Sequence, residues 1–134
     1  MWTFLKRLLL IGSASTLAAP TAAQAAKVEH ALIVTTVGVP VTPKDVFAIE
    51  DELRQAFAQL SVGEVDGNEI AVDGSEALIY MYGPDAEAMF AVALPILRSH
   101  PATARSRAML RFGDVSDKSA RVDLRMVNDA QWNQ

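Results

Sequence analysis

Side chains that could do acid–base or nucleophilic chemistry are few in this chain. His30 and His100 are the only histidines, and there is no cysteine. A histidine-dependent triad or general base would therefore need one of these two residues to meet a nucleophile from elsewhere in the sequence. Motifs of nucleophile elbows, phosphate-binding loops, zinc proteases and dinucleotide-binding folds are absent. The residues favour a binding protein over an enzyme and indicate no cofactor.

A cluster of oxygen-bearing side chains in the middle of the chain is a candidate for a calcium-binding site. Its members are Glu64, Asp66, Asn68, Glu69 and Asp73. The spacing of the twelve-residue helix–loop–helix calcium site, with its closing glutamate, is missing. Charges of this kind also protect an edge strand from pairing with another chain. We therefore expect a protected edge here and no metal site.

Four arginines near the C-terminus are candidates for binding an anion. They alternate with apolar residues along two predicted strands, so their guanidinium groups can gather on one side of a hairpin and hold a carboxylate or phosphate. The four are Arg107, Arg111, Arg121 and Arg125. The alternative is that they form the solvated side of an edge strand, with Asp123 between them.

Charge divides the chain into two unlike halves. The formal net charge is −4, which argues against general nucleic-acid binding. From Lys44 to Glu87 there are two basic and eleven acidic residues, whereas from Arg98 to Arg125 there are seven basic and three acidic ones. If the protein self-associates, the acidic middle of one copy can meet the basic strip of another.

The first 25 residues have the layout of a secretory signal. Lys6 and Arg7 precede an apolar run, and the segment ends in Ala23-Gln24-Ala25. We interpret 1–25 as a signal peptide and 26–134 as one domain, located in the periplasm or secreted and free of the membrane once the leader is removed. An uncleaved leader in a cytoplasmic protein is the alternative. A spanning helix would need roughly 20 apolar residues.

Two predicted strands are apolar on both of their alternating sets of side chains. These strands are Ala31–Val39 and Glu76–Gly83, so we expect both to lie centrally in a sheet. The segment Glu64–Ile70 instead alternates charged with apolar residues, as does the terminal hairpin formed by Arg105–Phe112 and Ala120–Val127. Asn128–Gln134 has no pattern.

Two helices connect these strands. The first is predicted to start after an N-cap at Thr42 and to end near Leu60, with Glu50 among the residues that face water. The second follows Gly83-Pro84-Asp85. Pro95 lies inside its apolar pattern, so we expect a kink there or an early end near Ala93.

The order of these elements is that of the split βαβ arrangement. It predicts an α+β, ferredoxin-like fold: an antiparallel sheet with two helices on one face and an added C-terminal strand. The expected first and third strands are the two that are apolar on both sides, which agrees with their central position in this fold.

Two segments of the chain also resemble a known group of proteins. Gly63–Glu69 reads GEVDGNE, and Leu78–Ala86 reads LIYMYGPDA. With these segments the sequence is similar to small bacterial ferredoxin-like proteins of unassigned function, over about Ala31–Leu97. The resemblance implies the fold and no activity. It also implies a cytoplasmic protein, and the predicted signal peptide differs from this pattern.

Two helices can cover only one face of such a sheet. Either Tyr80 and Tyr82 or Ile79 and Met81 are left facing outward, depending on register. An open apolar face of several hundred Å² is uncommon on a monomer. The alternative is that the C-terminal hairpin and Trp132 fold across it.

Two functional hypotheses follow. The first is a non-enzymatic, exported interaction module, a homo-oligomer through the open face that can also engage a protein partner. The second is a small-molecule-binding domain or enzyme of the ferredoxin-like class, in which the arginines hold an anionic ligand in a crevice between subunits.

Overall fold

The computed structural model describes residues 29–116, 118–127 and 131–133. The predicted signal peptide, residues 1–25, lies outside them, so the leader and the compartment stay predictions. The described elements, in chain order, are β1 (His30–Thr35), α3 (Pro43–Leu60), β2 (Glu64–Ile70), β3 (Ala77–Gly83), α4 (Ala86–Ser99), β4 (Arg107–Phe112), β5 (Ala120–Val127) and β6 (Gln131–Asn133).

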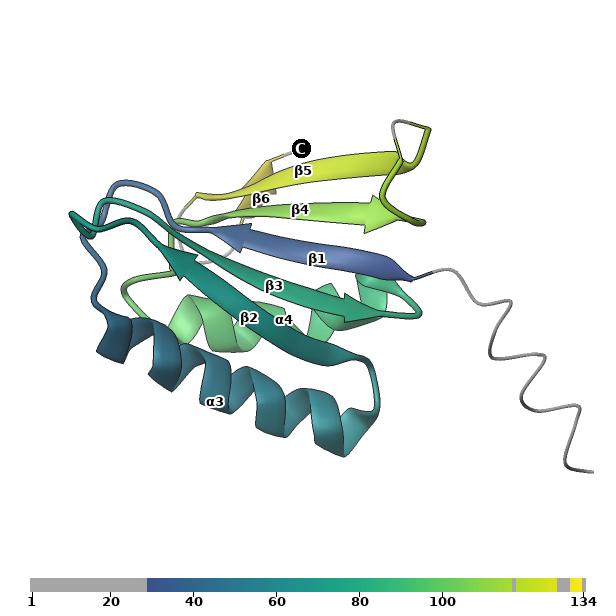
Figure 1. The fold of residues 1–134 in the computed structure, drawn as a ribbon, viewed down its shortest axis with the longest axis horizontal. Coiled ribbons are helices and arrows are strands. Elements are labelled where there is room, and N and C mark those ends of the chain that lie inside the picture. Colours follow the sequence, from purple (N-terminus) through teal and green to yellow (C-terminus); the bar gives the residue numbers. More distant parts are fainter. Residues whose placement is uncertain (1–28, 117, 128–130, 134) are drawn as a thin grey trace, which may run out of the picture.

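Within the described residues, the strands form one six-stranded antiparallel sheet in the order β2-β3-β1-β4-β5-β6. Both helices lie on the same side of this sheet, below it in Figure 1. This is the predicted ferredoxin-like fold, with β1 and β3 in the interior and β5 added beside β4. The short strand β6, which the sequence pattern did not predict, extends the sheet beyond β5.

The core lies between the sheet and the two helices. From the sheet come Leu32 and Val34 of β1 and Ile79 and Met81 of β3, all 0% exposed. They pack against a stripe of helix residues spaced three and four apart. On α3 and α4 this stripe consists of Val46, Ile49, Leu53, Phe57, Met89, Ala93 and Leu97.

Helix α3 begins as its sequence predicts. The amide of Asp45 donates to Thr42 Oγ1 at 3.2 Å, and the amide of Thr42 donates to Asp45 Oδ2 at 2.9 Å, which is a complete capping box. The hydrogen bonds from Thr42 lower the pKa of the Asp45 carboxyl below its usual value. The helix ends at Leu60, where Ser61 takes a left-handed conformation with φ 52°.

Of the two expectations for α4, a kink at Pro95 or an early end near Ala93, the early end is wrong, because the helix continues through Pro95 to Ser99. A proline at this position lacks the N–H that would bond to the carbonyl of Ala91. Both residues are exposed, so water can reach the carbonyl left without its helical partner.

Strand β1 is shorter than the predicted Ala31–Val39. It ends at Thr35. The amide of Thr36 still donates to the carbonyl of Ala77 at 2.9 Å, but the amide of Ala77 donates to the side chain, Thr36 Oγ1, at 2.9 Å. Gly38 follows with φ 72°, a conformation that ends an extended segment.

Candidate functional site

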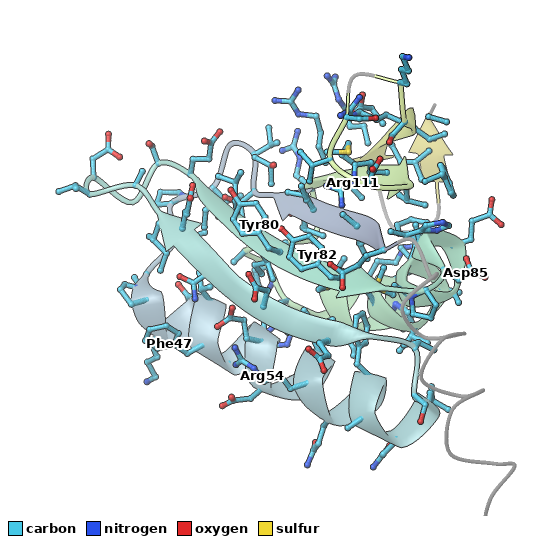
Figure 2. The ribbon with its side chains drawn as sticks, turned by 45° about the vertical axis from the view of Figure 1, so that its right-hand side comes forward. Phe47, Arg54, Tyr80, Tyr82, Asp85 and Arg111 are labelled. Atoms are coloured by element: carbon cyan, nitrogen blue, oxygen red, sulfur yellow. The ribbon has the colours of Figure 1, made fainter. Side chains whose placement is uncertain are left out.

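The register of β3 decides which of its side chains face away from the helices. Ile79 and Met81 are in the core, and successive residues of a strand point to opposite faces. Tyr80 and Tyr82 therefore lie on the uncovered side, and both are partly exposed. In Figure 2 their rings lie over the sheet, with Arg111 beyond them toward β4. Of the four candidates on this strand, only the two tyrosines can meet a partner.

Three rows of side chains cross this uncovered side, because directly paired residues of neighbouring strands point the same way. The first row is Glu64, Tyr82, Ala31, Arg111 and Arg121. The second is Gly67, Tyr80, Ile33, Met109 and Asp123. The third is Glu69, Leu78, Thr35, Arg107 and Arg125. We call these fifteen residues the open face; each outer row begins with a glutamate and ends with two arginines.

The first row contains a fixed cation. Arg111 is 6% exposed, its Nε donates to the carbonyl of Gly113 at 2.7 Å, and its guanidinium carbon lies 6.0 Å from the ring centroid of Tyr82. Between the two in the sheet stands Ala31, which is 0% exposed. The side chains of Tyr82 and Arg111 thus cover Ala31, and the cation–π contact between them restrains both side chains.

The acidic end of the open face surrounds a shallow depression. It has a volume of about 420 Å³ and is lined by Asp66, Gly67, Asn68, Glu69, Tyr80 and Tyr82. Burial raises the pKa of the Tyr80 hydroxyl, and the neighbouring Glu69 carboxylate raises it further. The phenol therefore stays neutral over the physiological range and can donate a hydrogen bond.

All four predicted anion-binding arginines lie on the open face, on β4 and β5. Arg111 is paired directly with Arg121, and Arg107 with Arg125. Arg121 donates to the carbonyls of Ser116 and Ser119, at 3.0 and 3.4 Å. Arg107 and Arg125 are exposed, and no described residue forms an ion pair with either. Like charges directly opposite one another repel, so an anion from outside the chain would stabilise this end.

The oxygen-bearing cluster does not converge on one point. Glu64 and Glu69 lie on the open face, whereas Asn68 points to the helix side and Asp73 accepts from the amide and hydroxyl of Ser75 in the hairpin. Among the described residues no group of three or more histidine and carboxylate side chains is arranged to hold a metal ion.

Both histidines make structural contacts. Nδ1 of His30 accepts a hydrogen bond from the amide of Ala86 at the start of α4, at 3.1 Å, and its ring meets that of Phe112 edge-on. Nε2 of His100 lies 2.8 Å from Oε1 of Glu52 on α3. His30 therefore connects β1 to the start of α4, and His100 connects the end of α4 to α3.

Glu50 is a polar residue whose burial differs from the prediction. It was expected to face water, but it is only 2% exposed, and its Oε2 accepts from Asn68 Nδ2 at 2.9 Å. Its Oε1 has no hydrogen-bond partner among the described residues. The signal was present, because position 50 lies four residues after Val46 and three before Leu53, within the buried stripe.

None of the helices in the described residues is both long and apolar enough to cross a membrane. Comparisons with models of known protein families, with curated proteins and with solved structures give no match for this chain.

Proposed function

We propose that the protein is a non-enzymatic interaction module that self-associates through the open face. The observation that supports this most strongly is the contrast within β3: its helix side is fully buried, while Leu78, Tyr80 and Tyr82 on the other side stay partly exposed. An uncovered surface that carries large apolar and aromatic side chains is typical of protein–protein interfaces.

A second copy of the chain is the partner that the charges favour. Glu64 and Glu69 stand at one end of the open face, and the arginine pairs stand at the other. Each copy therefore offers carboxylates to the arginine pairs of the other, in which no described residue forms an ion pair with Arg107 or Arg125. Opposite charges across an interface speed encounter and fix orientation.

The test is the molar mass of the chain in solution, by size-exclusion chromatography with light scattering. We expect twice the chain mass for the wild type and the mass of one chain for Tyr80→Glu, because a carboxylate between Ile33 and Gly67 would be buried without a cationic partner. The control is Phe47→Glu on α3, where the phenylalanine is 53% exposed on the helix side; this variant should stay dimeric. A wild type that is monomeric at high concentration would contradict the proposal.

The repelling pair Arg107 and Arg125 supports a second candidate, a small-molecule-binding domain for an anionic ligand in a crevice between subunits. A ligand that binds only the folded state raises the unfolding midpoint by mass action. Citrate and phosphate should then raise the melting temperature of the wild type more than that of Arg107→Ala. Equal shifts in both proteins would count against this candidate.

Export is proposed on the leader alone, from Lys6, Arg7 and Ala23-Gln24-Ala25. The mass of the mature chain tests it. Removal of residues 1–25 supports export, whereas an intact N-terminus in a protein purified from the cytoplasm contradicts it.

A further inference from the structure

We propose that two copies pack their open faces about a two-fold axis that runs parallel to β1 and passes over Ile33. The inference rests on the proposed function, since it takes the open face as the surface of self-association. It adds which residues of the two copies meet, and it follows from the order of the strands and the three rows.

A two-fold axis that packs a sheet face on a copy of itself lies between the two sheets, and its two limiting directions are across the strands and along them. An axis across the strands places each strand over its own copy, so the glutamates of β2 would face glutamates and the arginines of β4 and β5 would face arginines. An axis along the strands exchanges the two ends of the face. Like charges juxtaposed across an interface cost several kcal/mol, so charge selects the axis along the strands.

The position of the axis follows from counting strands. Of the five strands that carry the open face, β1 is the middle one: β2 lies two strands away on one side and β5 two strands away on the other. With neighbouring strands about 4.8 Å apart, an axis over β1 brings β2 of one copy over β5 of the other, and β3 over β4. An axis over any other strand would leave one of the charged ends without its counterpart.

The rows then meet in register. In the outer rows Glu64 faces the partner's Arg121, and Glu69 faces the partner's Arg125, so one arginine of the repelling pair Arg107 and Arg125 gains a carboxylate. In the middle row Tyr80 meets the partner's Met109. Ile33 and Thr35, both on β1, each face their own copy at the axis. Apolar contacts therefore lie at the centre of the middle row, whereas in the outer rows Tyr82 and Leu78 face the partner's Arg111 and the partner's Arg107. The ion pairs lie at the rim, as in many protein interfaces.

Charge exchange tests this arrangement, with the full-length chain expressed with its own leader. Glu69→Arg and Arg125→Glu should each weaken the dimer about tenfold or more, because each creates two symmetry-related repulsive contacts. A mixture of the two variants should form a heterodimer at least as stable as the wild-type dimer, since every contact in it is again between opposite charges. With an axis across the strands neither single variant would weaken the dimer, because residue 69 would face β2 and residue 125 would face β5 of the other copy.

Cross-linking tests the position of the axis. The chain has no cysteine, so single introduced cysteines report without background. With a short bis-maleimide, Ile33→Cys and Thr35→Cys should each link to themselves, and Glu69→Cys should link only when mixed with Arg125→Cys. Val72→Cys, at the fully exposed hairpin tip, is the control that should not link.

The outcomes separate the two proposals. A monomeric wild type overturns the proposed function together with this arrangement and leaves the open face to a different partner. A dimeric wild type in which Ile33→Cys fails to link, or in which the charge variants fail to form a heterodimer, overturns the arrangement and leaves self-association standing.

Discussion

The two faces of the sheet in this protein differ in burial and in the role that we assign to their side chains. On the helix side, Ile79 and Met81 are completely buried, and what they contribute is stability. On the open face, Tyr80 and Tyr82 are backed by the same strand but face no helix, and they stand between a glutamate strand and two arginine strands. Side chains of similar size on one strand thus divide into a set that specifies the fold and a set that is free to specify a partner.

The largest expected effect is on the helix side. Ile79→Ala should lower the free energy of unfolding by about 2–5 kcal/mol, because it leaves a cavity in the hydrophobic core between the sheet and the helices. Tyr80→Ala, one residue away, should cost the monomer much less. Urea unfolding at low protein concentration measures both, and equal losses would erase the distinction between the two faces.

The next effect concerns the buried carboxylate that joins α3 to β2. Asn68→Ala removes the amide that donates to Glu50 Oε2 and should cost about 1–3 kcal/mol, since the carboxylate stays buried. Glu50→Gln keeps the shape and should cost less. If Asn68→Ala is as stable as the wild type in the same urea titration, the pair does not hold the edge strand.

A smaller effect is expected at the start of α4. His30→Ala removes the ring nitrogen that accepts from the amide of Ala86 and should destabilise the fold by about 1 kcal/mol. His30→Asn offers another acceptor and serves as the control. Thermal unfolding of the three proteins measures the difference, and identical midpoints would show that this contact is dispensable.

The smallest effect is a pH dependence at the capping box of α3. The pKa of Asp45 is lowered in the folded state by its hydrogen bonds with Thr42, so its stabilising contribution is present above the unfolded pKa and is lost as pH falls through the folded pKa. Asp45→Asn should therefore be less stable than the wild type near neutral pH, and the gap should close in acid. A gap that is constant from pH 7 down to acid would contradict this cause.

The fold could be predicted from the sequence because local signals, namely capping residues and the spacing of apolar residues, indicate most of its strands and helices. The start of α3 follows from its capping residues, Thr42, Pro43 and Asp45. The period-two pattern of β4 and β5 correctly predicted that the four arginines lie on one side of the sheet. The outward set of β3 could not be predicted, because residues 77–82 are apolar or aromatic at every position and either register satisfies the pattern. Only the packing of the helices decides between them.

The remaining differences arise where a tertiary contact overrides a local rule. Position 50 belongs to the buried stripe of α3 by its spacing, but a carboxylate is accommodated there because Asn68, eighteen residues away, donates to it and Arg54 lies 3.7 Å from it. Strand β6 pairs with β5 although its residues show no alternation. Helix α4 passes Pro95 because the affected carbonyl faces solvent. Each depends on a neighbour distant in sequence or on solvent access, which periodicity along the chain does not record.

Sedimentation equilibrium over a wide range of concentrations tests most directly whether the open face is the surface of self-association. We predict that the wild type and Phe47→Glu shift from the mass of one chain to that of two as concentration rises, while Tyr80→Glu keeps the mass of one chain throughout. A wild type that stays monomeric, or a Tyr80→Glu variant that dimerises as well as the wild type, would contradict this role of the open face.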